Sequence, residues 1–260
     1  EATESTQYTQ HVMRSIGTFT VAHTPYTWLS NRINVGYDVT DEQNLQLRPY
    51  QTADSVKFFL GRHFDGFRDN TRHQRYNTTL DAASSLDFSL SDGIASTTSF
   101  GMQYYSKKTE TIRAKGEDFP GPGLLTIEAT GTQTVSFDTF EENATLGFYA
   151  QQVFGLGDRL FLTGAVRVDN NSAFGDEIMW VTYPKASVSY VLHEEPWFAE
   201  GKPAFLDAFR LRAAWGQSGV QPPSFVALKT FGFVPGPVGK SGVSPGTLGN
   251  PDLRPEIGDE

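Results

Sequence analysis

Apolar and polar residues alternate along much of the chain, most clearly in residues 159–169, which read RLFLTGAVRVD. Leu160, Leu162, Val166 and Val168 fall on one face of an extended chain, and the charged residues of the segment fall on the other. A period of two is that of a β-strand, because successive side chains of a strand point to opposite faces. The segment is therefore predicted to be a strand with one apolar and one polar face.

Seven more segments show this alternation between Gly, Pro and Asn residues that mark turns. The eight predicted strands cover residues 12–22, 29–38, 75–90, 94–104, 144–150, 159–169, 185–192 and 209–218. The Arg, Lys and Asp residues within these strands fall on the polar faces, and no segment shows a convincing helical period. The sequence therefore predicts an all-β, antiparallel fold.

The connectors between the predicted strands alternate in length. Residues 91–93 and 154–158 form short turns, whereas the connectors of opposite parity are long and cover about residues 40–74, 106–140, 170–182 and 219 onward. The connector at residues 193–205 is an exception, because it belongs to the side with short turns but is longer than they are. Short turns on one side and long loops on the other are typical of outer-membrane barrels, and a β-sandwich has no reason to alternate in this way. The connectors therefore favour a transmembrane β-barrel, with lipid on the apolar face and a wet lumen on the polar face.

Composition removes several other classes of protein. Only 38% of the 260 residues are hydrophobic and no apolar run approaches 18 residues, so membrane-spanning helices are excluded. The net charge of -9 argues against nucleic acid, and the absence of Cys excludes disulfides and thiol chemistry. The five His residues lack metal-ligand spacing, and the sequence GQSG at 216–219 lacks the second Gly of a nucleophile elbow. We therefore expect no enzyme activity, no cofactor and no metal site.

Four segments of the second half resemble SusC/RagA-type TonB-dependent outer-membrane transporters, in the order and spacing of that family. They are GDRLFLTGAVR with VDNNSAFG (157–175), YPKASVSYVLHEEPWF (183–198), LRAAWGQSGVQP (211–222) and GNPDLRPE (249–256). The last segment resembles the stretch that opens a late barrel strand in these receptors. Four such segments in sequence make the resemblance specific, although the first half of the chain is less distinctive.

The resemblance implies a 22-stranded barrel in the outer membrane of a Gram-negative-type bacterium, of which about eight strands are expected here. It also implies import of a nutrient, usually a glycan or a peptide, driven by the TonB–ExbB–ExbD complex through a plug. A SusD-like lipoprotein would be the partner on the outside. The sequence shows no plug-like segment, no TonB box and no terminal barrel strand, so residues 1–260 are expected to be an internal part of the barrel domain.

Two groups of residues are candidates for function. Charged side chains on neighbouring polar faces are expected to face the lumen, either to contact substrate or to pair with one another and keep the wall rigid: Arg159, Arg167, Asp169, Lys185, Arg210 and Arg212. Aromatic rings stack on sugars and on apolar side chains, so aromatic loop residues are candidates for contact with substrate or with the lipoprotein: Trp180, Phe225, Phe231 and Phe233. The same rings could instead hold the shape of their own loops.

Two alternatives stay open at this stage. A passive, porin-like barrel would lack a plug and a TonB box upstream in the parent protein. A soluble all-β binding or adhesion module would bury its apolar strand faces against a second sheet. In a barrel, by contrast, the apolar set should point outward to lipid: Leu160, Leu162, Val166, Val188, Leu211 and Trp215. Arg167, Lys185 and Arg212 should then point inward.

Overall fold

A computed structural model describes residues 6–52, 65–174, 180–201, 203, 205–220, 226–235, 240–250, 253 and 255–260. Almost all of the regular structure is antiparallel β-strand. The helical elements are short, and α2 (Pro196–Ala199) has only four residues. None of the helices in the described part is long and apolar enough to cross a membrane.

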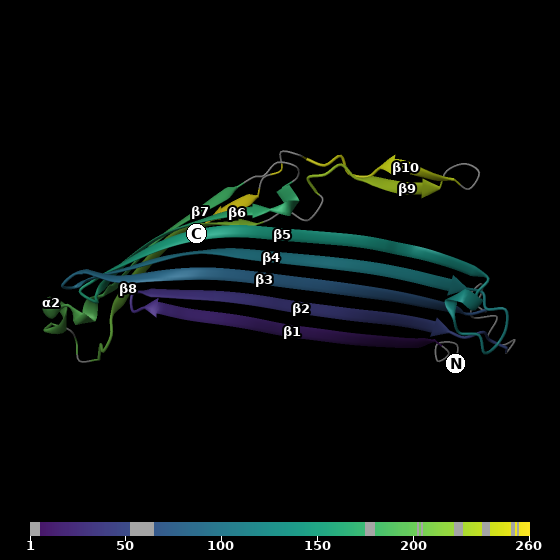
Figure 1. The fold of residues 1–260 in the computed structure, drawn as a ribbon, viewed down its shortest axis with the longest axis horizontal. Helices are drawn as coiled ribbons and strands as arrows, with labels where there is room; N and C mark the ends of the chain where they lie inside the picture. Colours follow the sequence, from purple (N-terminus) through teal and green to yellow (C-terminus); the bar gives the residue numbers. More distant parts are fainter. Residues whose placement is uncertain are drawn as a thin grey trace. The chain divides into compact units, whose positions relative to one another are not determined.

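One nine-stranded sheet dominates the structure (Figure 1). Its strands are β1 (Gln7–Tyr26), β2 (Leu29–Arg48), β3 (Phe67–Ser91), β4 (Ile94–Glu117), β5 (Thr132–Leu156), β6 (Leu160–Asn171), β7 (Val181–Val191), β8 (Arg210–Val220) and β11 (Glu256–Asp259). Their order in the sheet is their order in the chain, except that β11 follows β8 directly. Between these two strands, β9 (Phe231–Pro235) and β10 (Ser241–Pro245) form a separate antiparallel hairpin. This up-and-down arrangement confirms the predicted all-β, antiparallel class.

The chain divides into two compact units, and the longest strands contribute to both. The first unit comprises residues 1–17, 37–78 and 107–142, which include the parts of β1–β5 next to the connectors at 49–66 and 118–131. The second unit comprises residues 18–36, 79–106 and 143–260, which include the remaining parts of these strands together with β6–β11.

The prediction of very long connectors at residues 40–74 and 106–140 is wrong. The strands on either side extend into both regions, so that β3 and β5 each have 25 residues, and the true connectors are residues 49–66 and 118–131. The missed parts of the strands carry polar residues on both faces, as in TDEQN at 40–44. A strand that is wet on both sides has no apolar face, so the period-two signal disappears although the backbone pairing continues.

The count of eight strands is also too low, because β11 forms the ninth strand of the sheet. It pairs with β8 in the register Glu256 to Val220 and Asp259 to Gln217. Its first residue is the last residue of the GNPDLRPE segment. The prediction that this segment opens a strand is therefore confirmed.

The apolar face of the second unit is exposed in this chain. The register places Leu162 opposite Val188, and Leu211 opposite Tyr190, so these apolar side chains share one face of the sheet. Leu162, Val188 and Leu211 are 41%, 37% and 51% exposed. The soluble-module alternative required this face to be packed against a second sheet, and such packing would have buried these residues.

Each unit contains a cluster of aromatic side chains. In the second unit, Trp28 in the β1–β2 turn stacks between Tyr26 and Phe88, with ring centroids 5.2 and 5.4 Å apart. In the first unit, the Nζ atom of Lys108 lies 5.9 Å from the ring centroid of Tyr76 and 5.1 Å from that of Phe140. Rings with a polar edge or a neighbouring cation suit the boundary between hydrocarbon and water.

Candidate functional site

Most of the predicted charged residues share the face opposite the apolar set. Arg167 lies opposite Tyr183, Lys185 lies opposite both Ala165 and Gly216, and Arg212 lies opposite Ser189. Directly opposed residues of an antiparallel pair point to the same side of the sheet. Asp169 and Arg210 have the same parity along their strands, so the polar face carries all of these charges.

A cavity of about 370 Å³ opens where β5–β8 present this polar face. Three of the predicted residues line it, namely Arg167, Asp169 and Lys185. Two tyrosines that the sequence analysis did not single out, Tyr149 and Tyr183, complete the wall. The structure therefore brings together half of the charged set and adds two phenol groups to it.

The charge of Arg167 is largely compensated inside this cavity. Its Nε atom lies 2.8 Å from Oδ2 of Asp169, and its Nη2 atom donates a hydrogen bond of 3.1 Å to Oε1 of Gln103. The other carboxylate oxygen of Asp169, Oδ1, is buried and has no hydrogen-bond partner among the described residues. Both side chains lie against Gly147, where a Cβ atom would collide with them. The pair therefore stiffens the wall and leaves Lys185 as the exposed cation of the cavity.

Glycines on neighbouring strands make room for both tyrosine rings. A Cβ atom at Gly101 would lie 2.8 Å from Cζ of Tyr149, and one at Gly219 would lie 2.6 Å from Cζ of Tyr183. An aromatic ring laid over a strand glycine covers the backbone that the missing side chain would expose. The positions of the phenol groups in the cavity therefore depend on these two glycines.

The remaining charged candidates lie away from the cavity. Arg159, next to the turn before β6, forms an ion pair with Glu195, with Nη1 and Oε2 3.0 Å apart. Arg210 and Arg212 are exposed and lie at the beginning of β8. The six predicted residues thus share a face or its margin but do not form a single cluster.

The aromatic candidates within the described residues lie in two different environments. The ring of Trp180 packs against Phe148, which lies opposite Val168 of β6, with centroids 5.9 Å apart. This contact places Trp180 beside the apolar face, not in the polar cavity. Phe231 and Phe233 lie in β9, whereas Phe225 lies outside the described residues.

The β9–β10 hairpin has an apolar face of its own. Phe233 lies directly opposite Val243, and Phe231 has the same parity, so the three side chains share one side. Phe233 is 87% exposed, and the ring of Phe231 is approached by Nζ of Lys229 at 5.3 Å. An exposed apolar face of this kind is typical of a contact surface for another molecule.

The first unit contains a network of ion pairs that the sequence analysis missed. Arg113 forms a bidentate pair with the buried carboxylate of Asp69, beside a cavity of about 360 Å³. Arg75 lies 3.1 Å from Glu42, and Arg72 pairs with Asp41. The hydrogen bond from Arg72 lowers the pKa of Asp41. The signal was hidden because these residues lie in the strand regions that lack an apolar face.

Comparisons with known proteins agree with this geometry. A family model described as TonB-dependent receptor-like, β-barrel matches residues 5–260. The chain belongs to the TonB-dependent receptor β-barrel family. Among curated proteins, none matches the chain by sequence.

Solved structures show the same fold. The RagAB peptide transporter matches with a TM-score of 0.86 and 18% identity, over 98% of this chain and 28% of that chain. The RagAB peptide importer in its open-open state matches with a TM-score of 0.84 and 18% identity, over the same shares of the two chains. The chain therefore spans little more than a quarter of these proteins. The predicted resemblance to SusC/RagA-type transporters is confirmed, and the family and its structural neighbours are transporters and receptors, not enzymes.

Proposed function

We propose that this chain forms part of the wall of an outer-membrane transporter that imports peptides by TonB coupling, with a SusD-like lipoprotein as its partner. The observation that carries the proposal is the division of one sheet into two faces. One face is apolar and exposed at Leu162, Val188 and Leu211, and the other carries the ion pair of Arg167 and Asp169. Lipid on the first face would cover the exposed apolar side chains, and a water-filled lumen on the second would hydrate the charged ones.

In this placement the polar-face residues line the route of the substrate. The paired Arg167 and Asp169 keep the wall rigid, while the exposed Lys185 offers an ammonium group to a carboxylate. Tyr149 and Tyr183 offer hydroxyl groups that accept from peptide N–H groups or donate to carbonyl oxygens. A peptide carries all three partners, which is why we favour it over a glycan. The likeness to the RagAB peptide transporter, at 18% identity, supports the same choice through its fold.

The hairpin is the proposed contact with the lipoprotein. Turn parity directs β8 toward the side of the long loops, and β9–β10 follow β8 in the chain. The exposed rings of Phe231 and Phe233 then lie on the outside of the cell, where a lipoprotein lid would bind. Trp180 is not part of this proposal because its ring packs against Phe148.

Uptake of labelled peptides tests the proposed function. The full-length parent would be expressed in its host, located by membrane fractionation, and assayed with a fluorescent peptide library and with labelled oligosaccharides. We expect the parent in the outer membrane and peptide uptake that stops when TonB is deleted. Uptake that persists without TonB would favour a passive porin, uptake of oligosaccharide alone would contradict the peptide, and a parent in the soluble fraction would contradict the membrane placement.

A hairpin variant tests the lipoprotein contact separately. Phe231→Ala with Phe233→Ala should lower co-purification of the lipoprotein at least about tenfold, because exposed aromatic anchors dominate such interfaces. Val234→Ala is the matched control, because Val234 has the opposite parity on the same strand. Barrel assembly should be normal in both variants. Wild-type binding by the double variant would show that these rings do not form the contact.

A further inference from the structure

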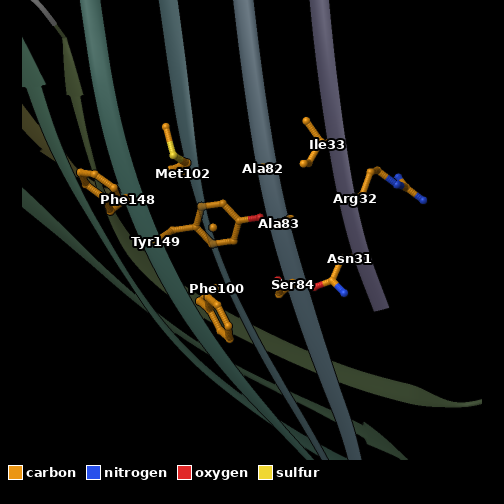
Figure 2. A pocket seen from close by; sticks show the side chains of 11 residues that line it. Asn31, Arg32, Ile33, Ala82, Ala83, Ser84, Phe100, Met102, Phe148 and Tyr149 are labelled. Carbon is orange, nitrogen blue, oxygen red and sulfur yellow. Dashed lines mark hydrogen bonds between the residues drawn. The ribbon is translucent and has the colours of Figure 1, made fainter. Parts of the chain in front are cut away.

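The apolar face of β2–β5 contains a groove of about 560 Å³ (Figure 2). Its floor is formed by the small residues Ala82 and Ser84 of β3. Ile33 of β2 stands on one side, and Phe100 and Met102 of β4 stand on the other. All of these residues belong to the second unit.

Hydrogen bonds between side chains assign the groove to the apolar face. Ser84 Oγ donates to Asn31 Oδ1 at 2.7 Å, so the odd residues of β2, which include Ile33, share a face with the even residues of β3. On the opposite face the hydroxyl groups of Ser85 and Ser99 lie 3.2 Å apart, which places the even residues of β4 with Ser84. Figure 2 shows the ring of Tyr149 extending from β5 across β4. This ring covers Gly101, an odd residue of β4, and Tyr149 lies opposite Arg167, so the ring belongs to the polar face and not to the groove.

The groove offers an apolar ligand everything it needs and a polar ligand very little. Its apolar-face residues carry no charge, and Arg32, which also borders it, is an even residue of β2 whose side chain belongs to the opposite, polar face. Its polar side chains on that face, Asn31 and Ser84, are bonded to each other, so an apolar occupant leaves neither of them unsatisfied. Ile33 and Phe100 are 46% and 48% exposed and give the groove two firm walls.

The position of the groove along β3 indicates which leaflet of the membrane faces it. Ser84 is eight residues from Asp92 in the short β3–β4 turn. In the other direction, twelve residues separate it from Arg72, the first charged residue on the same face. Ala82 lies midway between the two charged residues, so the groove extends from the middle of this apolar stretch toward the short turns, which face the periplasm in the proposed placement. The periplasmic leaflet of an outer membrane consists of phospholipid.

We propose that this groove holds one acyl chain of a phospholipid from the periplasmic leaflet. The proposal rests on the membrane placement of the proposed function but not on its substrate. A hydrocarbon chain seated between Ile33 and Phe100 makes many close contacts with a rigid wall, and these dispersion contacts distinguish it from the mobile chains around it. The wall then carries one ordered lipid at a defined site.

Photo-cross-linking of the full-length parent tests this site. The parent would be placed in nanodiscs of phosphatidylethanolamine and phosphatidylglycerol, doped with a phosphatidylethanolamine whose acyl chain carries a diazirine. Cross-linked peptides would be mapped by mass spectrometry. We expect cross-links concentrated at Ile33 and Met102, and a decrease of at least fivefold in Ala82→Leu, which fills the floor. Ala186→Leu adds the same atoms to the same face at an exposed position of β7 and should leave the cross-links unchanged.

Each other outcome overturns the proposal. Cross-links spread evenly over the apolar face would show that the groove binds no ordered chain. Equal yields from Ala82→Leu and the wild type would show that the floor does not form the site, and cross-links between two copies of the parent would make the groove a protein interface. A parent that enters the membrane and imports peptide, but lacks the cross-link, refutes only the lipid site. A parent outside the membrane refutes the proposed function as well.

Discussion

A single lysine should lower the free energy of unfolding much more on the apolar face of β3 than on its polar face. Ala82 and Ala83 are adjacent residues of β3 and therefore point to opposite faces. Ala82 forms the floor of the groove on the apolar face, whereas Ala83 belongs to the polar face. The variants Ala82→Lys and Ala83→Lys thus make the same chemical change one residue apart. Ala82→Leu adds bulk at the first position without charge.

The expected loss of stability in Ala82→Lys follows from the position of Ala82 in the strand. Arg72 and Asp92 each lie ten residues away, which is about 34 Å of extended chain and about 24 Å along the membrane normal at a 45° tilt. Half the height of an apolar band is only about 12 Å, so Ala82 lies near its centre. A lysine facing lipid there costs about 2–4 kcal/mol, which is about a 30- to 700-fold change in the folding equilibrium.

The assay is urea-induced unfolding of the full-length parent in phospholipid vesicles, followed by the mobility of folded and unfolded bands on semi-native gels. We expect a loss of about 2–4 kcal/mol in Ala82→Lys. Ala83→Lys should lose less than about 1 kcal/mol, because its ammonium group reaches the wet side. Similar losses in the two lysine variants, or a larger loss in Ala83→Lys, would refute the assignment of faces. A loss in Ala82→Leu as large as in Ala82→Lys would show that bulk, not charge, is responsible.

Three further predictions concern the polar cavity and the first unit. Gly219→Ala should destabilise the barrel by about 1–3 kcal/mol, since its Cβ atom would meet the ring of Tyr183, and Tyr183→Ala should recover much of this loss in a double-mutant cycle of unfolding free energies. Arg167→Ala should lower the free energy of unfolding more than the double change Arg167→Ala with Asp169→Ala, because the single change leaves an unpaired carboxylate. A third of the arginine side chain is exposed, so the loss should be below the roughly 3–5 kcal/mol of a fully buried pair. Equal losses of the single and double variants on urea titration would contradict this account. The hydrogen bond from Arg72 holds the pKa of Asp41 below its ordinary value of 3.8, so the ion pair stabilises the fold above that pH and this stabilisation is lost as the pH falls. Asp41→Asn should therefore flatten the dependence of thermal unfolding on acid pH. An unchanged profile would rule out this contribution.

The strand content and the two faces of the sheet were available from the sequence. In β6 and β7 the alternation is strong because one side of each strand excludes charge along its whole length. The alternation places Leu162 and Val188 on one face and Arg167 and Lys185 on the other, and the register agrees. A period-two pattern needs only local sequence, since a shift of one residue would exchange the two faces.

The polar cavity could be predicted only in part. The alternation predicts the charges of Arg167 and Lys185 on polar faces, but it gives no reason to select Tyr149 or Tyr183. Tyr149 and Tyr183 enter the cavity wall because glycines on neighbouring strands leave space for their rings. Which glycine lies beside which ring depends on the register between strands, and that register is not written in either strand alone.

The sequence by itself determined that this chain contains a set of amphipathic antiparallel strands and that the charges within the amphipathic segments lie on one side. Only the tertiary structure decided how far β3 and β5 extend, that Arg113 meets Asp69, and that Trp180 packs against Phe148. The physical reason is the same in each case. Alternation records a difference in solvent between two faces, so it ends where both faces are wet, whereas pairing between strands continues for as long as backbone hydrogen bonds can form.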